Sequence, residues 1–370
     1  MPEENAKKQN LLEKFVGLIG AIIGPAVMMF VVAGILKGVL TILTTVNLLS
    51  SDSGTYLILY SLADSIYYFL PILLAYTSAQ KFGANVFSSL IVAATLIHPD
   101  ITAAVDAGTS ITFLGIPVYL VDFSSTLFPI MFAVALLAFL EKRFDKIFPE
   151  AIRGFFTPLF ALVITVPVTF LVIGPITYYL SAGLTWVYNT FYNFAPWAAG
   201  VLMGAGWHVL MIFGLHLAML PLILLNVATF GFDTICPMVG MSCVAQAGAC
   251  FGVFLRSRNS ETKGVATAST ISGLLGTTET CVYGCNFIFR RPYYIAVVTG
   301  AVFGGFIGMI GTTSSSLVSP GIPTLPAFFG PTFGIYCAAY VVNFLVTAAL
   351  VYFFGYKEDM DKISLSEKTA

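Results

Sequence analysis

Residues 15–46 read FVGLIGAIIGPAVMMFVVAGILKGVLTILTTV, and this stretch decides the fold class. Lys37 is its single charged residue. The run is longer than the roughly 20 apolar residues that cross a bilayer as a helix. It is also too long for the apolar core of a cleavable signal, and residues 1–14 before it are polar and of mixed charge. We therefore predict that this stretch remains in the protein as a membrane helix.

The rest of the chain has the same character. Of its 370 residues, 58% are hydrophobic and only 9% are charged, and the mean hydropathy is +0.92. This composition is too apolar for a soluble domain, and a net charge of −1 gives no sign of nucleic-acid binding. We predict an all-α polytopic membrane protein with room for about eight to ten spans. The expected helices cover residues 15–46, 57–79, 86–98, 112–139, 156–180, 197–227, 236–255, 295–312 and 333–355.

The positions of Lys and Arg predict the orientation, because cytoplasmic loops of membrane proteins collect basic residues. Connections near residues 50–56, 99–122 and 181–197 contain neither Lys nor Arg, so we place them outside. Both termini are then expected in the cytoplasm. The basic clusters placed inside are Lys7, Lys8 and Lys14; Lys142, Arg143, Lys146 and Arg153; Arg256, Arg258 and Lys263; Arg290 and Arg291; and Lys357, Lys362 and Lys368.

Several segments depart from the plain apolar pattern. Residues 141–155 mix charged and apolar side chains in a way typical of an amphipathic helix in the membrane interface, and they are a candidate joint between two halves, 15–140 and 156–356. Glycine, proline and polar residues interrupt residues 204–226 and 269–292, which predicts broken or re-entrant segments that line a cavity. Residues 311–331 are expected to form a loop or short hairpin, and residues 357–370 a polar tail.

The cysteines are expected to be small packing residues. Cys236, Cys243 and Cys250 recur every seven residues on one helix stripe, and Cys281 and Cys285 are one turn apart. Metal ligands come as clusters with His or acidic partners at close spacing, and none is present in the sequence. We expect no metal site and no cofactor.

Ionisable groups at membrane depth are costly, so each one is a functional candidate. Glu279 is the strongest, because Gly276, Thr277, Thr278 and Thr280 around it allow the backbone to break and offer hydrogen bonds beside a carboxylate. Such a carboxylate binds a donor-rich ligand such as a sugar, binds a cation or proton, or stays protonated. The alternative is a structural Glu paired with Lys or His.

The remaining candidates have competing structural roles. His216 lies in a distorted apolar stretch and is as readily structural as functional; His208, two turns earlier, is a weaker ligand candidate. His98 is expected to cap the apolar segment that it ends or to line a pathway, Lys37 and Asp64 either pair with each other or serve a ligand, and Asp233 is an N-cap or a ligand group. Aromatic side chains flank the candidates and suit the C–H faces of sugars: Trp207, Phe213, Tyr283 and Phe287.

A set of motifs in order resembles enzyme IIC, the membrane component of the bacterial phosphoenolpyruvate-dependent sugar phosphotransferase system, in its beta-glucoside, sucrose and trehalose branch of the glucose superfamily. The resemblance covers residues 15–330. The motifs are YFLPILLA at 68–75, KFGAN at 81–85, LIHP at 96–99, VIGPI at 172–176, FGLH at 213–216 with Pro221 and Asn226, GVFL at 252–255, and the segment 276–286 followed by RP at 291–292.

The resemblance implies a homodimer in the bacterial inner membrane, with about ten transmembrane helices in each protomer. The N-terminal half would be a scaffold and dimerisation half, and the C-terminal half would hold the sugar between re-entrant hairpins. Glu279 and His216 would contact the sugar hydroxyl that receives the phosphoryl group. Further side chains expected to bind substrate are Thr277, Thr278, Tyr283, Asn286, Asn226, His98, Asp64, Lys37 and His208.

The same resemblance implies a sugar permease that acts as the transport component of a protein-Nπ-phosphohistidine–sugar phosphotransferase. The phosphoryl group would come from a phosphocysteine on a partner enzyme IIB, supplied by an upstream IIA, and we expect no IIB domain within this sequence. The family has Ile and Pro at the positions of Thr277 and Thr280, and Trp at that of Leu217, so the pocket shape differs. The alternative function is a proton- or ion-coupled or facilitative sugar carrier, or a sugar sensor, without phosphorylation.

Overall fold

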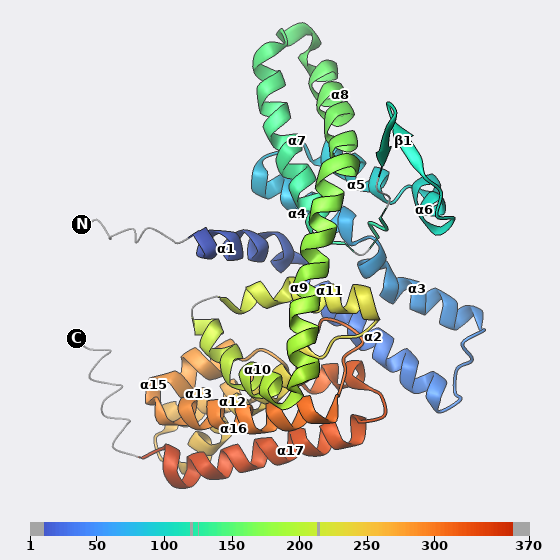
Figure 1. Ribbon diagram of the computed structural model, residues 1–370. Coiled ribbons are helices and arrows are strands. Elements are labelled where there is room, and N and C mark those ends of the chain that lie inside the picture. The colour runs from blue at the N-terminus through green and yellow to red at the C-terminus, as the bar shows by residue number, and fades with distance from the viewer. Residues whose placement is uncertain (1–10, 119–120, 125, 213–214, 358–370) are drawn as a thin grey trace, which may run out of the picture. The chain divides into compact units, whose positions relative to one another are not determined.

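The computed structural model describes residues 11–118, 121–124, 126–212 and 215–357, which form two compact units (Figure 1). The first unit comprises Met1–Met29, Asp64–Val187 and Leu217–Ala228, and the second comprises Phe30–Ala63, Tyr188–His216 and Thr229–Ala370. Helices α2 (Val27–Thr45), α3 (Gly54–Tyr68) and α9 (Gly174–Phe194) each belong partly to both units. The units therefore do not correspond to two consecutive halves of the sequence.

The first unit is built around a helical hairpin. Helices α7 (Phe128–Ile147) and α8 (Glu150–Val168) run antiparallel, and α4 (Leu70–Phe82) packs on α5 (Val86–Leu96) and α7 (Figure 1). Beyond α8, a π-helical turn η2 (Thr169–Ile173) leads into α9. The unit also contains α1 (Leu11–Ile23), the 3₁₀ turn η1 (Gly24–Ala26), α6 (Pro99–Asp106) and most of α11 (Leu220–Phe230).

The helix predicted over 112–139 is wrong in its first part. Strands β1 (Ile111–Phe113) and β2 (Ile116–Val118) form an antiparallel hairpin in which Ile111 pairs with Val118. The two residues between the strands, Leu114 and Gly115, have φ values of 51° and 83°. Positive φ at both central residues is the geometry of a tight hairpin turn. A short apolar run does not by itself distinguish a strand from a helix, which explains the error.

The single amphipathic helix predicted over 141–155 is absent. Residues 141–147 end α7, and α8 begins at Glu150. Phe148 between them is extended, with φ −85° and ψ 134°. The cause is Pro149, because a proline disfavours helical backbone in the residue before it. Charged residues of this segment therefore lie at the closed end of the α7–α8 hairpin.

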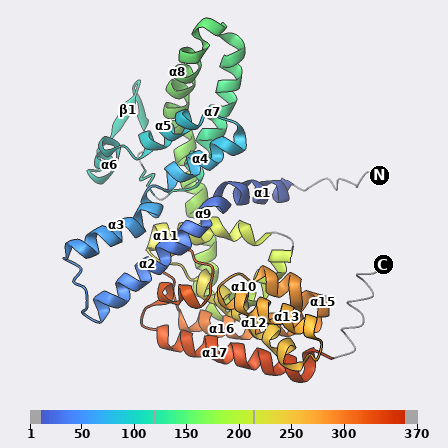
Figure 2. The ribbon, with the colours of Figure 1, turned by 180° about the vertical axis from the view of Figure 1, so that it is seen from behind.

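Helix α12 (Ile235–Arg256) is the centre of the second unit. It packs against α10 (Pro196–Ile212), α13 (Ser260–Leu274), α16 (Arg291–Ile310) and α17 (Phe333–Leu350), and Figure 2 shows these helices together. Glycines let α10 and α16 approach closely, since a Cβ on Gly204 would overlap the Gly300 carbonyl. Such small-residue contacts are typical of helices that pack within a membrane.

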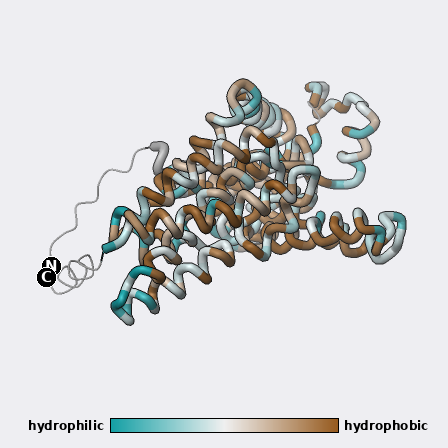
Figure 3. Tube along the Cα trace, turned by 90° about the horizontal axis from the view of Figure 1, so that it is seen from below, coloured by the Kyte–Doolittle hydropathy of each residue, from teal (hydrophilic) through white to brown (hydrophobic). Residues whose placement is uncertain are grey.

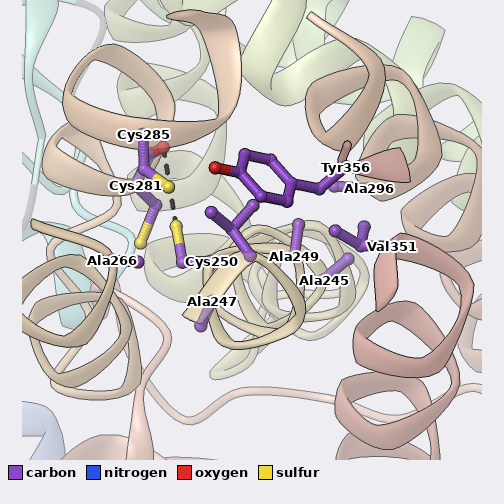
Figure 4. Packing of buried hydrophobic residues seen from close by; sticks show 11 residues of the cluster. Ala245, Ala247, Ala249, Cys250, Ala266, Cys281, Cys285, Ala296, Val351 and Tyr356 are labelled. Carbon is purple, nitrogen blue, oxygen red and sulfur yellow. Dashed lines mark hydrogen bonds between the residues drawn. The ribbon is translucent and has the colours of Figure 1, made fainter. Parts of the chain in front are cut away.

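The predicted packing role of the cysteines is confirmed. Cys250 on α12 faces Cys281 and Cys285 in a buried cluster (Figure 4). The Cys250 thiol donates to the carbonyl of Cys281 at 3.7 Å, and Cys281 donates to the Ser269 carbonyl at 2.9 Å. Thiols therefore join α12 and α13 to the segment that follows α13.

The protein is a multi-pass membrane protein. Six helices among the described residues are long and apolar enough to cross a bilayer, or up to seven if the bent pair α3 and α4 is one span. Figure 3 shows apolar residues along most of the helices and polar residues gathered at helix ends. The candidate spans are residues 17–45, 86–106, 150–194, 235–256, 291–310 and 333–355.

Candidate functional site

The site predicted around Glu279 begins where α13 ends. Gly276 has φ 100°, in the region that favours glycine, and a Cβ there would lie 2.9 Å from the Ser319 carbonyl oxygen. The Ser319 hydroxyl donates to the Gly276 carbonyl. Gly276 therefore turns the chain tightly against the irregular segment that precedes the 3₁₀ helix η5 (Ile322–Phe328).

The chain then continues as a series of short helical pieces. A three-residue turn α14 (Glu279–Cys281) leads into the π-helical turn η4 (Val282–Asn286) and into α15 (Phe287–Phe289). Arg290, with φ 61°, separates α15 from α16. The interruption predicted within residues 269–292 is thus present. Insertions of π-helical turns into helices are common at functional sites.

Glu279 and His216 lie close enough to interact electrostatically. Glu279 begins α14 and its side chain is exposed. His216 lies in the 3₁₀ turn η3 (Leu215–Met219), which interrupts the helix predicted over 197–227. Phe213 and Gly214, which precede it in the FGLH motif, are outside the described residues. The two side chains expected to act on the sugar therefore lie within electrostatic range of each other.

An aromatic ring lies against His216, and one of its ring nitrogens has no partner among the described residues. Its imidazole stands edge to face with the Trp207 indole, with 5.6 Å between ring centroids. Its Nδ1 atom is buried and has no hydrogen-bond partner among the residues that the structure describes. Buried polar atoms are normally paired, so the unpaired Nδ1 is a feature that a purely structural role of His216 does not explain.

The two threonines before Glu279 face different surroundings. Thr277 is exposed, whereas Thr278 is buried, with 4% of its surface accessible. The Thr278 hydroxyl lies 3.1 Å from Nε2 of His208. His208 itself is fully buried, and its Nδ1 lies 2.7 Å from the Ser242 hydroxyl.

Asn286 and Tyr283 attach the same segment to neighbouring helices. The Asn286 amide is fully buried and donates to both the backbone and the side-chain oxygen of Gln246, each at 2.8 Å. The Tyr283 hydroxyl donates to the Met211 carbonyl at 3.1 Å, and the ring is half exposed. Asn286 is therefore held within the protein, while the Tyr283 ring is available for contact.

Four other predicted residues stand elsewhere in the chain. His98 caps α6, the helix that follows it, and not the apolar segment before it that it was expected to cap; its ring accepts the Asp100 backbone N–H at 3.3 Å. Asn226 is buried on α11, and both residues belong to the first unit, as does Asp64. Lys37, on α2 in the second unit, lies over the Tyr60 ring at 5.5 Å.

Ser242 and Gln246 are partners that sequence reasoning missed. Both lie on α12, where they contact His208 and Asn286 respectively. Gln246 offered a usable signal, because an amide in the middle of an otherwise apolar helix needs a partner.

Asp233 was predicted as an N-cap or a ligand group, and its carboxylate accepts the Cys236 backbone N–H at 2.7 Å at the start of α12.

This arrangement suits a neutral, hydroxyl-rich ligand. Glu279 can accept a hydrogen bond or a proton from a hydroxyl, His216 offers a ring nitrogen, and Trp207 offers an apolar face beside them. Among the residues described, no group of three His, Cys, Asp or Glu side chains is placed to hold a metal ion.

Comparison with known proteins places these features in a family. The family model described as "Phosphotransferase system, EIIC" matches residues 20–301. A beta-glucoside-specific EIIBCA component of Dickeya chrysanthemi is 39% identical over 90% of this chain and 53% of that protein. A Bacillus subtilis beta-glucoside-specific EIIBCA component is 33% identical over 96% of this chain and 58% of the relative.

Less similar relatives are also components of phosphotransferase systems. A sucrose-specific EIIBC component of Klebsiella pneumoniae is 29% identical over 94% of this chain and 75% of its own length. The solved structure of ChbC, the IIC component of an N,N'-diacetylchitobiose-specific phosphotransferase system, matches with a TM-score of 0.52 and 14% identity, over 97% of this chain and 94% of that one, which shows a shared fold. The chain spans little more than half of the beta-glucoside relatives. This chain belongs to the EIIC family of the phosphotransferase system.

Proposed function

We propose that this protein carries a sugar across the bacterial cytoplasmic membrane while a partner IIB domain phosphorylates it. The observation that carries this proposal is the proximity of Glu279 to His216 at an interrupted helical segment of an EIIC family member. A carboxylate and an imidazole beside an aromatic ring are the groups needed to bind and activate a sugar hydroxyl.

The proposed sugar is a beta-glucoside, with sucrose and trehalose as related candidates. Support comes from the beta-glucoside-specific relatives, which are 33% to 39% identical to this chain. Thr280 and Leu217 stand where the family resemblance implies Pro and Trp. Those changes remove a rigid residue beside Glu279 and an aromatic surface beside His216, so we expect a wider pocket.

Phosphoryl transfer would follow from the site as one displacement. The sugar hydroxyl oxygen forms the new bond to phosphorus, the bond from phosphorus to the IIB cysteine sulfur breaks, and the thiolate leaves. Glu279 orients the hydroxyl and accepts its proton, and His216 hydrogen-bonds the same region of the sugar. Positioning and a matched general base are the two contributions that the membrane protein makes.

The wider architecture is part of the proposal. It comprises about ten transmembrane helices in each protomer of a homodimer, re-entrant hairpins, and both termini in the cytoplasm. Residues 15–140 would act mainly as scaffold and dimerisation half, and residues 156–356 as the sugar-binding half. Clusters of Lys and Arg near the helix ends support the orientation. IIB and IIA activities would come from other domains or polypeptides.

An uptake experiment distinguishes this function from a carrier or sensor without phosphorylation. Right-side-out vesicles containing the protein, IIB and the upstream phosphotransferase components are given radiolabelled p-nitrophenyl β-glucoside, with or without internal phosphoenolpyruvate. The proposal predicts that sugar phosphate appears inside only with phosphoenolpyruvate. Accumulation of unmodified glucoside at the same rate in both conditions would identify a carrier instead.

A further inference from the structure

We infer that His208 is a positioning residue that fixes Glu279 through the hydroxyl of Thr278, without touching the sugar. The inference rests on the proposed function for the role of Glu279. It assigns the two histidines of this region different tasks, and it predicts which substitutions at position 208 preserve activity.

The His208 ring joins three elements of the second unit. It projects from α10, its Nδ1 lies 2.7 Å from the Ser242 hydroxyl on α12, and its Nε2 lies 3.1 Å from the Thr278 hydroxyl. The residue has no accessible surface. A ligand in the site therefore has no path to the ring, because both nitrogens are already engaged and the surface is covered.

Neutral imidazole suits this position. It carries one N–H donor and one bare acceptor nitrogen, and a hydroxyl can take either complementary role. Ser242 and Thr278 can therefore both be satisfied without a charge in the protein interior. Satisfied buried polar groups hold a single geometry, whereas an unpaired one carries a penalty.

The Thr278 hydroxyl is committed to this contact and not to its own helix. Thr278 is the N-cap of α14, where a threonine usually accepts a backbone N–H of the first turn. Here its side chain makes no such bond among the described residues. The hydroxyl instead contacts His208.

One peptide bond joins Thr278 to Glu279, the proposed general base. Thr278 directly precedes Glu279, so a fixed Thr278 restricts the backbone from which the carboxylate projects. His216 differs, because it is only partly buried and part of its side chain stays accessible. His216 is thus the histidine that can contact a ligand, whereas His208 acts through Thr278 and does not contact the ligand.

Three substitutions test the inference by their effect on turnover with p-nitrophenyl β-glucoside and phospho-IIB. His208→Gln offers one donor and one acceptor, so it should keep kcat within about threefold of wild type. His208→Leu and Thr278→Val remove the contact and should each lower kcat roughly ten- to a hundredfold, with a smaller change in KM, as loss of a buried hydrogen bond permits. The double variant should lose no more than the worse single variant.

A matched control shows whether the loss of any buried threonine hydroxyl lowers kcat. Thr270 is also buried, but its hydroxyl donates to the Ala266 carbonyl in its own helix at 2.7 Å. Thr270→Val should leave kcat unchanged. Equal loss in His208→Gln and His208→Leu, or additive losses in the double variant, would overturn the inference.

Hydrogen exchange gives a readout that does not depend on phosphorylation. In His208→Leu, amides of residues 278–286 should exchange roughly ten- to a hundredfold faster, while those of residues 262–272 on α13 keep their rates; His208→Gln should restore slow exchange. Uniform acceleration along the second unit, or none, would overturn the positioning role. If wild type forms no sugar phosphate, the proposed function fails, and the exchange pattern still decides the role of His208.

Discussion

The Asn286 side-chain amide donates to the Gln246 side-chain oxygen at 2.8 Å, deep between the interrupted segment and α12. Asn286 also donates to the Gln246 carbonyl and accepts from the Cys250 thiol. Because both partners are fully buried, this pair fixes the segment that carries Glu279 onto the central helix.

Replacing Gln246 by Leu should therefore destabilise the protein by about 1–3 kcal/mol, since it leaves a buried amide of Asn286 with one partner fewer. Thermal unfolding in detergent measures the effect. Gln80 is exposed on α4, so Gln80→Leu is the matched control and should leave the midpoint nearly unchanged. A Gln246→Leu midpoint equal to that of the control would show that the pair contributes nothing to stability.

Helices α10 and α16 provide a second test. A Cβ at Gly204 would overlap the Gly300 carbonyl, whereas nothing lies within 4 Å of a Cβ at Gly206. Gly204→Ala should lower the unfolding midpoint by forcing the helices apart. Gly206→Ala should leave it unchanged or raise it slightly, because alanine favours the helix by about 0.5–1 kcal/mol. The same response in both variants would argue against close backbone packing at this pair.

Gly276 should tolerate no side chain. Its φ of 100° and the nearby Ser319 carbonyl make Gly276→Ala strained, and we expect a cost of at least about 1–2 kcal/mol and a strong loss of transport. Gly284→Ala is the control within the same segment, since the nearest atom would be the Ser269 hydroxyl at an ordinary 3.6 Å. Unfolding midpoints and uptake rates are measured together, and wild-type values for Gly276→Ala would contradict the tight turn.

Glu141 gives a prediction about pH. It lines a cavity of about 600 Å³ in the first unit and accepts the Asn85 backbone N–H at 2.8 Å. Burial raises the pKa of its carboxyl above the ordinary value of 4.5, although the Asn85 bond opposes that shift. The folded chain therefore binds this proton more tightly than the unfolded chain does.

The contribution of Glu141 to the unfolding free energy should be greatest below pH about 4.5 and should fall as the pH rises through the raised pKa. Glu141→Gln keeps an acceptor for Asn85 but removes the titration. The difference in unfolding free energy between wild type and this variant should change across that window, and the variant should be no less stable at pH 7. If the difference in unfolding free energy between wild type and Glu141→Gln did not change with pH, the raised pKa would be refuted.

Apolar helices were predictable because hydropathy and length alone define them. The predicted ranges 236–255 and 333–355 agree closely with α12 and with α17 continued by the π-helical turn η6 (Val351–Gly355). Helix α13 was missed since its sequence, SETKGVATASTISGL, is too polar to register as a span. The β1–β2 hairpin and the break at Pro149 depend on turn geometry, which apolar content does not report.

Site residues were partly predictable for a different reason. A carboxylate and histidines in apolar surroundings are conspicuous in any sequence, so Glu279, His216 and His208 were identified. Their roles were not, because burial and partners depend on residues far along the chain. Only the structure brings Ser242 to His208 and Gln246 to Asn286.

The rate at which purified phospho-IIB phosphorylates p-nitrophenyl β-glucoside in proteoliposomes, for wild type and Glu279→Gln, tests the central claim most directly. The account predicts that the amide variant folds and still binds the glucoside but forms sugar phosphate roughly a hundred to ten thousand times more slowly, as loss of a general base implies. Glu261→Gln, at an exposed position on α13, should match wild type. Full activity of Glu279→Gln would contradict the account.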